Sequence, residues 1–245
     1  MSNEPVEIKV TLSEKVPTAL STLGLGLDPD HESPVQIWFL EDETPGIRTK
    51  LPLLAAGIVI RLRSSHSKAD STIKLRPCRR TQLIPKWSTS SPDGKKYRLE
   101  QDWAGQRRTL AASAVHQLAP GLIEDVTSNG KDLCTLFNDH QQQFLEDCAD
   151  LRIAFAGLTP LGPVNAAKWK NITVGDLDSE VDAERWTFGS VDFLELSIRA
   201  ERDAGKHQRR FEEAIRAQGL SFSLEQEPKT SQILTELSTA HHADR

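Results

Sequence analysis

The chain has 245 residues, of which 38% are hydrophobic and 27% are charged, an ordinary globular composition with enough apolar residues for a sizeable core. Its net charge of -5 argues against general nucleic-acid binding, so any basic cluster is a local feature of an acidic protein. Three cysteines without C-x-x-C spacing, an N-terminus without an apolar signal core and the lack of a long apolar run predict a cytoplasmic protein with reduced thiols and no membrane partner.

The first forty residues predict two strands and a helix. Residues 6–12 alternate, with Val6, Ile8 and Val10 on one face and Glu7 and Lys9 on the other, which is typical of a half-buried strand. A helix is expected over 14–23, ended by glycines, and a second strand over 35–40. A loop over 42–46 and a helical turn or irregular cover over 51–56 follow.

A hairpin is the most informative stretch of the sequence. Residues 57–65 and 71–78 each alternate, and the polar residues 66–70 between them fit a hairpin loop. Arg61 and Arg63 share a face of the first strand, and Lys74 and Arg76 share a face of the second. Like charges on neighbouring strands repel, so this face indicates a binding site for an anion.

The middle of the chain predicts a strand over 81–87, a turn over 91–94 and a strand over 97–103. In the last of these, Arg98, Glu100 and Asp102 share one face. Helices are expected over 109–118 and 133–150, so that residues from about 109 to 150 form a helical insertion.

The last third of the chain returns to strands, expected over 151–155, 164–172, 186–188 and 193–200. Lys168 and Lys170 share a face of one of them, and Glu195 and Arg199 share a face of another. A charged helix is expected over 202–218, and residues 239–245 are expected to be a disordered tail.

These elements predict an α+β protein whose antiparallel strands each have one apolar and one charged face. Because the charged face carries similar residues in strand after strand, a closed β-barrel with a charged lumen and helices packed outside accounts for them better than an open sheet. Guanidinium and ammonium groups suit a polyanion such as a triphosphate, and clustered carboxylates suit Mg²⁺ or Mn²⁺. The cations are Lys9, Arg61, Arg63, Lys74, Arg76, Arg98, Lys168, Lys170 and Arg199, and the carboxylates are Glu7, Glu100, Asp102 and Glu195.

The motifs VEIKV, GIVIRLR, TIKLR, LGPV, KWK and FLELSIR, in this order from Val6 to about Leu234, resemble the CYTH superfamily of triphosphate tunnel metalloenzymes. The resemblance implies one domain over residues 1–238, built as an eight-stranded antiparallel tunnel that binds triphosphate and a divalent metal. Family activities include inorganic, thiamine and nucleoside triphosphatases and a class of adenylate cyclase.

By position, the resemblance implies that phosphate is bound by Arg61, Arg63, Lys74, Arg76, Lys168 and Lys170. It implies metal ligands at Glu7, Glu100, Asp102 and Glu195, with Lys9 orienting the substrate or the attacking water; Arg98 and Arg199 are added as phosphate ligands from their strand phase alone. Two family carboxylates are absent, because Pro5 replaces the first residue of E-x-E-x-K and Ser197 replaces the second glutamate of the late E-x-E.

Three functions remain open from the sequence. The first is a metal-dependent triphosphate phosphohydrolase in which Lys9, Glu100 and Asp102 act in catalysis. The second is a module that binds polyphosphate or a nucleotide without cleaving it, which the two missing carboxylates favour. Adenylate cyclase ranks third, because no base-recognition motif is present. The residues do not indicate which triphosphate compound is bound.

Overall fold

The computed structural model describes residues 4–26, 33–42, 51–91, 96–129, 132–223, 225–226 and 228–243. The predicted loop over 42–46 and turn over 91–94 lie largely outside these ranges.

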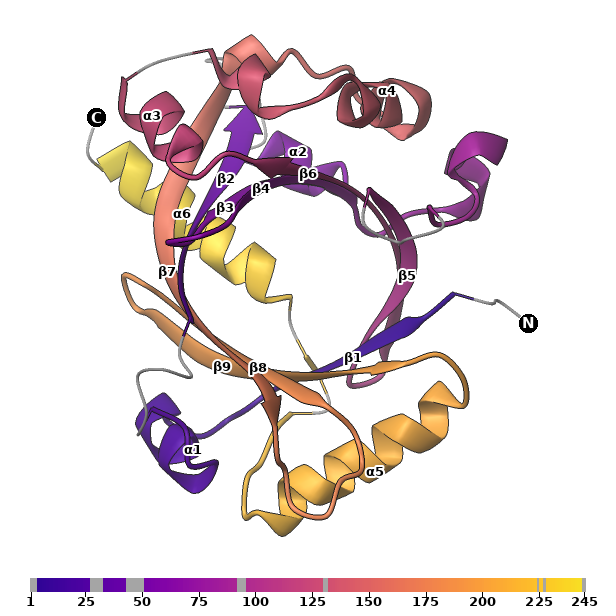
Figure 1. Cartoon of the computed structure of the whole chain (residues 1–245), viewed down its shortest axis with the longest axis vertical. Helices are drawn as coiled ribbons and strands as arrows, with labels where there is room; N and C mark the ends of the chain where they lie inside the picture. Colours follow the sequence, from indigo (N-terminus) through magenta and orange to yellow (C-terminus); the bar gives the residue numbers. More distant parts are fainter. Residues whose placement is uncertain are drawn as a thin grey trace. The chain divides into compact units, whose positions relative to one another are not determined.

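The described residues form nine strands in one mixed sheet (Figure 1). The strands are hydrogen-bonded in the order β1-β5-β6-β4-β3-β2-β7-β8-β9, and the sheet closes into a barrel. Strand β1 pairs in parallel with β5 and antiparallel with β9, so the predicted eight-stranded, purely antiparallel barrel is corrected to a mixed barrel of nine. The strands are β1 (Val6–Thr11), β2 (Ser33–Asp42), β3 (Ile58–Ser64), β4 (Ala69–Leu75), β5 (Tyr97–Ala104), β6 (Arg107–Leu118), β7 (Leu158–Ile172), β8 (Val181–Phe188) and β9 (Val191–Ala200).

Six α-helices and four short 3-10 turns accompany the strands in the described ranges. None of these helices combines the length and the apolar character needed to cross a membrane. The helices are α1 (Val16–Thr22), α2 (Pro52–Ala55), α3 (Leu122–Asn129), α4 (Asp139–Cys148), α5 (Ala204–Ala217) and α6 (Lys229–Ala243), and the turns are η2 (Arg80–Gln82), η3 (Pro85–Trp87), η4 (Leu133–Leu136) and η5 (Phe155–Gly157).

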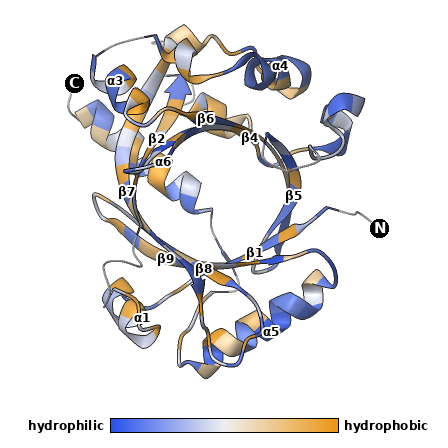
Figure 2. Cartoon of the chain, in the orientation of Figure 1, coloured by the Kyte–Doolittle hydropathy of each residue, from blue (hydrophilic) through white to orange (hydrophobic). Residues whose placement is uncertain are grey.

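The chain divides into two compact units, each with its own core. Unit 1 comprises residues 1–34, 100–109 and 165–228. Its core joins the apolar face of β1, including Ile8, and that of β9, including Leu196, to Phe211 and Ile215 of α5. Helix α5 is mostly hydrophilic in Figure 2, and these two buried side chains belong to its apolar stripe.

Unit 2 comprises residues 35–99, 110–164 and 229–245. Its core joins Leu62 of β3 and Ile73 of β4 to Phe144 of α4 and Ile123 of α3. Gln141 of α4 is fully buried, and its amide bonds to the backbone oxygens of β4 and β6, which fixes this helix on the sheet. In both units, therefore, helices cover the apolar face of the strands, and the charged residues alternate onto the opposite face.

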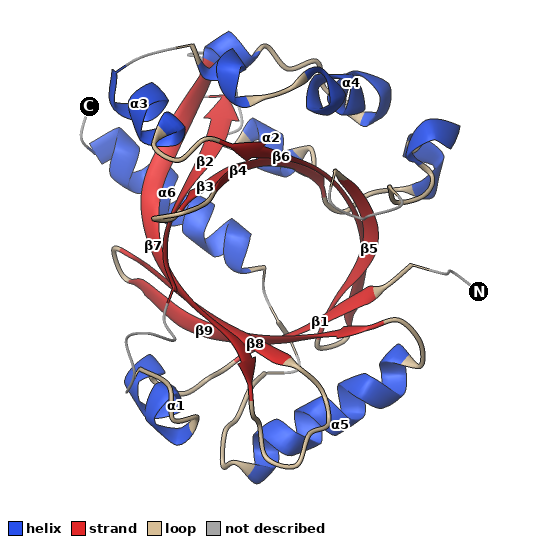
Figure 3. Ribbon diagram, in the orientation of Figure 1, coloured by secondary structure: helices blue, strands red, loops and turns tan. Residues whose placement is uncertain are grey.

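Four sequence predictions about elements are wrong. Residues 109–118, predicted as a helix, lie in strand β6, drawn as a strand in Figure 3, and the helical insertion begins only at α3. The alanines of β6 favour a helix, but continuous pairing with β4 overrides that propensity. Residues 81–87 and 151–155, predicted as strands, form 3-10 turns and irregular chain. Residues 239–243, predicted as disordered, are the end of α6.

The central hairpin is confirmed. Strands β3 and β4 pair antiparallel from Ile58 opposite Leu75 to Ser64 opposite Ala69. The backbone N–H of Ser65 donates to the carbonyl oxygen of Lys68 at 2.8 Å, which closes the loop that joins them. The hairpin therefore forms where the alternation predicts it, but β4 begins at Ala69, inside the predicted loop, and ends at Leu75, before Arg76. Arg61, Arg63 and Lys74 keep the predicted face.

Candidate functional site: a carboxylate cluster and a cationic strand face

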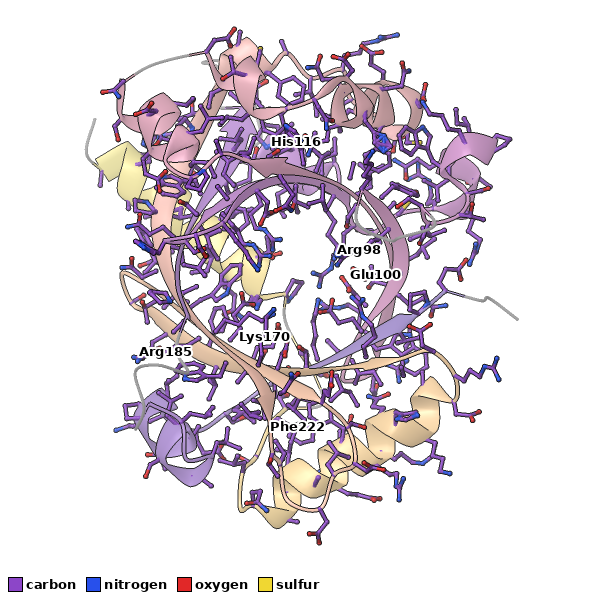
Figure 4. All side chains as sticks on the ribbon, in the orientation of Figure 1. Arg98, Glu100, His116, Lys170, Arg185 and Phe222 are labelled. Carbon is purple, nitrogen blue, oxygen red and sulfur yellow. The ribbon has the colours of Figure 1, made fainter. Side chains whose placement is uncertain are left out.

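In unit 1, three strands place a row of charged residues side by side. Glu7 of β1 is the register partner of Asp102 on β5 and of Arg199 on β9. Because Val6, Ile8 and Val10 are buried against α5, Glu7 and Lys9 point to the opposite face of the sheet. In Figure 4, Glu100 and Lys170 also lie on the side of the unit 1 strands away from α5, whereas Phe222 lies on the α5 side.

The carboxylates of this row already have cationic partners within the protein. The ammonium nitrogen of Lys9 is 2.8 Å from Glu7 Oε2 and 3.3 Å from Asp102 Oδ1. Arg199 donates from Nη2 to Glu100 Oε2 at 3.3 Å. These five residues are called the carboxylate cluster below: Glu7, Lys9, Glu100, Asp102 and Arg199.

Burial makes these charges interact strongly. Asp102 is 2% exposed and Glu100 is 6% exposed, and the side chain of Lys9 is 13% exposed. Carboxylates on neighbouring strands repel each other, and two buried carboxylates without partners would be costly. Lys9 and Arg199 offset this repulsion, so the cluster carries one net negative charge in the absence of any ligand.

Small neighbours give Lys9 room to reach the carboxylates. Its register partners are Ala104 on β5 and Ser197 on β9, neither of which extends a long side chain beside it. The family pattern would place a glutamate at Ser197, directly opposite Lys9. With serine at this position, the ammonium group of Lys9 contacts the carboxylates of Glu7 and Asp102.

The donor set of the cluster fits a hard divalent cation. One carboxylate oxygen from each of Glu7, Glu100 and Asp102 lies within 4.8 Å of the other two. Oxygens bound to one Mg²⁺ lie at most about 4.2 Å apart, twice the metal–oxygen bond length. Small rotations of the side chains would close that difference. Carboxylate oxygens are also the ligands that Mg²⁺ and Mn²⁺ prefer.

Three other predicted residues of unit 1 lie outside this cluster. Lys168 of β7 forms an ion pair with Asp182 of β8 at 2.9 Å, and Lys170 is exposed at an irregularity of the β7–β8 ladder. Glu195 is buried, and its carboxylate does not join the group of oxygens from Glu7, Glu100 and Asp102 that lie within 4.8 Å of one another. Its register partner on β8 is Glu184.

Sequence reasoning missed Asp182 and Glu184, which share the charged face with these residues. Asp182 lies opposite Ser197, and Glu184 lies opposite Glu195 and Lys168. The signal was present, because the segment from Val181 to Glu184 alternates apolar and acidic residues. The predicted strand over 186–188 began too late to include it.

In unit 2, the register of the β3–β4 hairpin places a polar or acidic residue, and not another cation, opposite each arginine. Arg61 lies opposite Thr72, and Arg63 lies opposite Asp70, whose Oδ2 is 3.5 Å from the guanidinium Nε. The expected repulsion between neighbouring strands is therefore reduced by an acidic or hydroxyl residue placed between the cations. Arg61, Arg63 and Lys74 still share one face, because Ile60, Leu62, Ile73 and Leu75 are buried on the other. Arg76 follows the last residue of β4.

Apolar side chains flank the arginines of this face. Ile37 and Phe39 of β2 are the register partners of Arg63 and Arg61 and are 0% and 1% exposed. Such neighbours exclude water and strengthen the attraction of a guanidinium for an anion. Arg98 of β5 alternates with buried Tyr97 and Leu99, so it too points away from the helix-covered face; Figure 4 labels it.

No protein-family model and no curated protein sequence match this chain. Solved structures do. One is HpAC1 from Hippeastrum, described as a candidate adenylyl cyclase with a dominant triphosphatase activity, at 14% identity over 95% of each chain with a TM-score of 0.63. Another is a candidate adenylate cyclase from Bacillus halodurans, at 11% identity over 94% of this chain and 97% of the other, with a TM-score of 0.59.

At these identities the likeness concerns the fold, and it spans nearly the whole of both chains. It agrees with the closed sheet. The chain shares the closed-barrel fold of these two structures. The closed barrel with helices outside is as the resemblance predicted, whereas the strand number and the parallel β1–β5 pairing are not.

Proposed function

We propose that this protein binds a triphosphate or inorganic polyphosphate and hydrolyses it with the help of Mg²⁺ or Mn²⁺. The observation that carries the proposal is the carboxylate cluster, in which three carboxylates and a lysine converge on the face of the strands opposite the helices. Within unit 2, the cations of the hairpin are side chains suited to phosphate oxygens. The triphosphatase activity described for HpAC1 supports the same reaction.

Each charged face has a distinct part in this proposal. The phosphate oxygens are bound by the hairpin cations Arg61, Arg63, Lys74 and Arg76, with Arg98, Lys168 and Lys170 as further ligands. The divalent ion would be held by Glu7, Glu100 and Asp102. Glu195, which lies outside the carboxylate cluster, is a further predicted ligand. When bound, the ion neutralises charge on the phosphate oxygens.

The reaction is attack by water on the terminal phosphorus. A P–O bond to the water oxygen forms as the bridging P–O bond breaks, and the leaving group departs as the shortened phosphate chain. Lys9 orients the terminal phosphoryl group or the attacking water, and Glu100 or Asp102 takes up a proton of that water. Positioning and charge stabilisation are the protein's main contributions to such a transfer.

A second candidate function, binding without cleavage, is favoured by one observation. Each carboxylate of the cluster already contacts Lys9 or Arg199, and Pro5 and Ser197 remove two further acidic groups. A protein whose carboxylates are paired with its own cations in this way can bind triphosphate without a metal. Adenylate cyclase remains a third candidate, because both structural neighbours are described as candidate cyclases.

Phosphate release from tripolyphosphate, thiamine triphosphate and ATP tests these functions, each with Mg²⁺, Mn²⁺ or EDTA. Release that requires a metal and disappears in the Glu100→Gln variant supports the hydrolase. Thermal stabilisation by tripolyphosphate without any release, unaffected by EDTA, supports the binding module. Conversion of ATP to cyclic AMP supports the cyclase.

A further inference from the structure

Lys9 has two carboxylate partners that are also the candidate metal ligands. Its ammonium group lies 2.8 Å from Glu7 Oε2 and 3.3 Å from Asp102 Oδ1. One oxygen of each of these residues, together with one of Glu100, belongs to the group that fits a divalent ion. Lys9 and a bound metal ion would therefore contact the same two carboxylates.

We propose that Lys9 competes with the divalent ion for Glu7 and Asp102, so that metal and triphosphate bind with positive coupling. The triphosphate draws Lys9 away from the carboxylates, and the ion then occupies them. The inference rests on the proposed function and adds an order to it: the metal enters with the substrate rather than before it.

Charge supports this order. With Lys9 and Arg199 in place, the cluster of three carboxylates has a net charge of only -1. That charge attracts a divalent ion weakly, and Mg²⁺ in particular loses its bound water reluctantly. A triphosphate brings several negative charges and oxygen acceptors for an ammonium group. Once Lys9 donates to phosphate, both Glu7 and Asp102 regain lone pairs for the metal.

The surroundings of Lys9 allow such a movement. Ala104 and Ser197, its register partners on β5 and β9, have short side chains that leave space beside it. Its contacts with Glu7 and Asp102 are ion pairs between side chains. Arg199 contacts the third carboxylate, Glu100, at 3.3 Å.

Calorimetric titration with Mn²⁺ tests the competition directly, with and without diimidotriphosphate, a triphosphate that cannot be hydrolysed. The wild-type protein is expected to bind Mn²⁺ at least about tenfold more tightly in the presence of diimidotriphosphate, and the reciprocal titration should show the same factor. The Lys9→Met variant should bind Mn²⁺ alone about tenfold more tightly than wild type, the scale of one lost charge-assisted contact, and should lose most of the coupling.

Two further variants separate this effect from others. Lys9→Gln keeps a polar side chain and can be tested if Lys9→Met fails to fold. It should show the same tighter binding of Mn²⁺ alone. Lys206→Met removes one positive charge from an exposed position of α5 and should behave as wild type. Both can be checked by thermal unfolding before titration.

The outcomes distinguish the inference from the function on which it rests. If Lys9→Gln binds Mn²⁺ alone no more tightly than wild type while coupling persists, the competition is refuted and the metal-dependent function stands. If neither protein binds Mn²⁺ under any condition while diimidotriphosphate binds, the metal site itself is refuted, and the competition with it.

Discussion

Replacing Asp102 with asparagine should weaken metal binding while leaving the stability of the fold nearly unchanged. Asp102 is 2% exposed, and its carboxylate is one of three that fit a divalent ion. The substitution keeps the size of the side chain and removes its charge. A charge and a doubly charged ion about 4 Å apart attract by about 8 kcal/mol at an effective dielectric constant near 20.

Most of that energy is offset by desolvation and by the relief of repulsion among the carboxylates, but even about 1.4 kcal/mol corresponds to a tenfold change in affinity. We therefore expect Asp102→Asn to bind Mn²⁺ at least about tenfold more weakly. Stability should change little, by about 1 kcal/mol, because Lys9 keeps its 2.8 Å contact with Glu7 and its charge-assisted hydrogen bond to Asp102 is replaced by one to a neutral amide oxygen.

The assay is calorimetric titration of Mn²⁺ with diimidotriphosphate present, together with urea unfolding. Asp192→Asn is a matched control in the same unit, because Asp192 accepts two hydrogen bonds from Arg185 outside the cluster. It should retain Mn²⁺ binding. Equal Mn²⁺ affinity in Asp102→Asn and Asp192→Asn would refute Asp102 as a ligand, and a loss of more than about 3 kcal/mol of stability in Asp102→Asn would assign the cluster a structural role.

Three further predictions concern unit 2. Arg61→Ala should weaken tripolyphosphate binding at least about tenfold by calorimetry, whereas Arg79→Ala, which removes an exposed pair with Asp150, should not; equal loss in both would refute a specific site. Gln141→Leu should cost about 2–4 kcal/mol in urea unfolding, because it removes buried hydrogen bonds to the backbone of β4 and β6; an unchanged midpoint would show that these bonds contribute nothing net. Burial, then Lys86 and Lys96, lower the pKa of His140 below 6.5. The unfolded chain therefore binds the proton more readily, and stability should fall as pH drops below about 6.5 in wild type but less in His140→Gln; parallel pH profiles would contradict this.

The sequence predicts the strands best where side chains alternate strictly. In β1 and β3, buried and partly buried residues alternate strictly and the charged residues share one phase, so the period of two was sufficient, although Val59 of β3 shares the phase of the arginines. In β6, four consecutive residues from Ala111 to Ala114 are buried, and neither the period nor the helix propensity of alanine indicates a strand there. Hydrogen-bonded pairing with β4 makes this segment a strand, and such pairing depends on residues elsewhere in the sheet.

The candidate site was predictable in its residues but not in its contacts. Strand phase placed Glu7, Glu100 and Asp102 on charged faces, but only the parallel pairing of β1 with β5 brings them together, and Lys9 and Asp102 are 93 residues apart in sequence. Arg199 was assigned to phosphate from its phase alone, and in the structure it contacts Glu100. Ion pairs between distant segments have no signature in local alternation.

The most direct test of the central claim is the release of phosphate from tripolyphosphate by the wild-type protein and by Asp102→Asn, in Mn²⁺ and in EDTA. The proposed function predicts release by wild type in Mn²⁺ alone, with Asp102→Asn reduced at least about tenfold at a tripolyphosphate concentration that saturates wild type. Release that continues in EDTA, or that is equal in the two proteins, would contradict the assignment of the carboxylate cluster as the metal site of a triphosphate hydrolase.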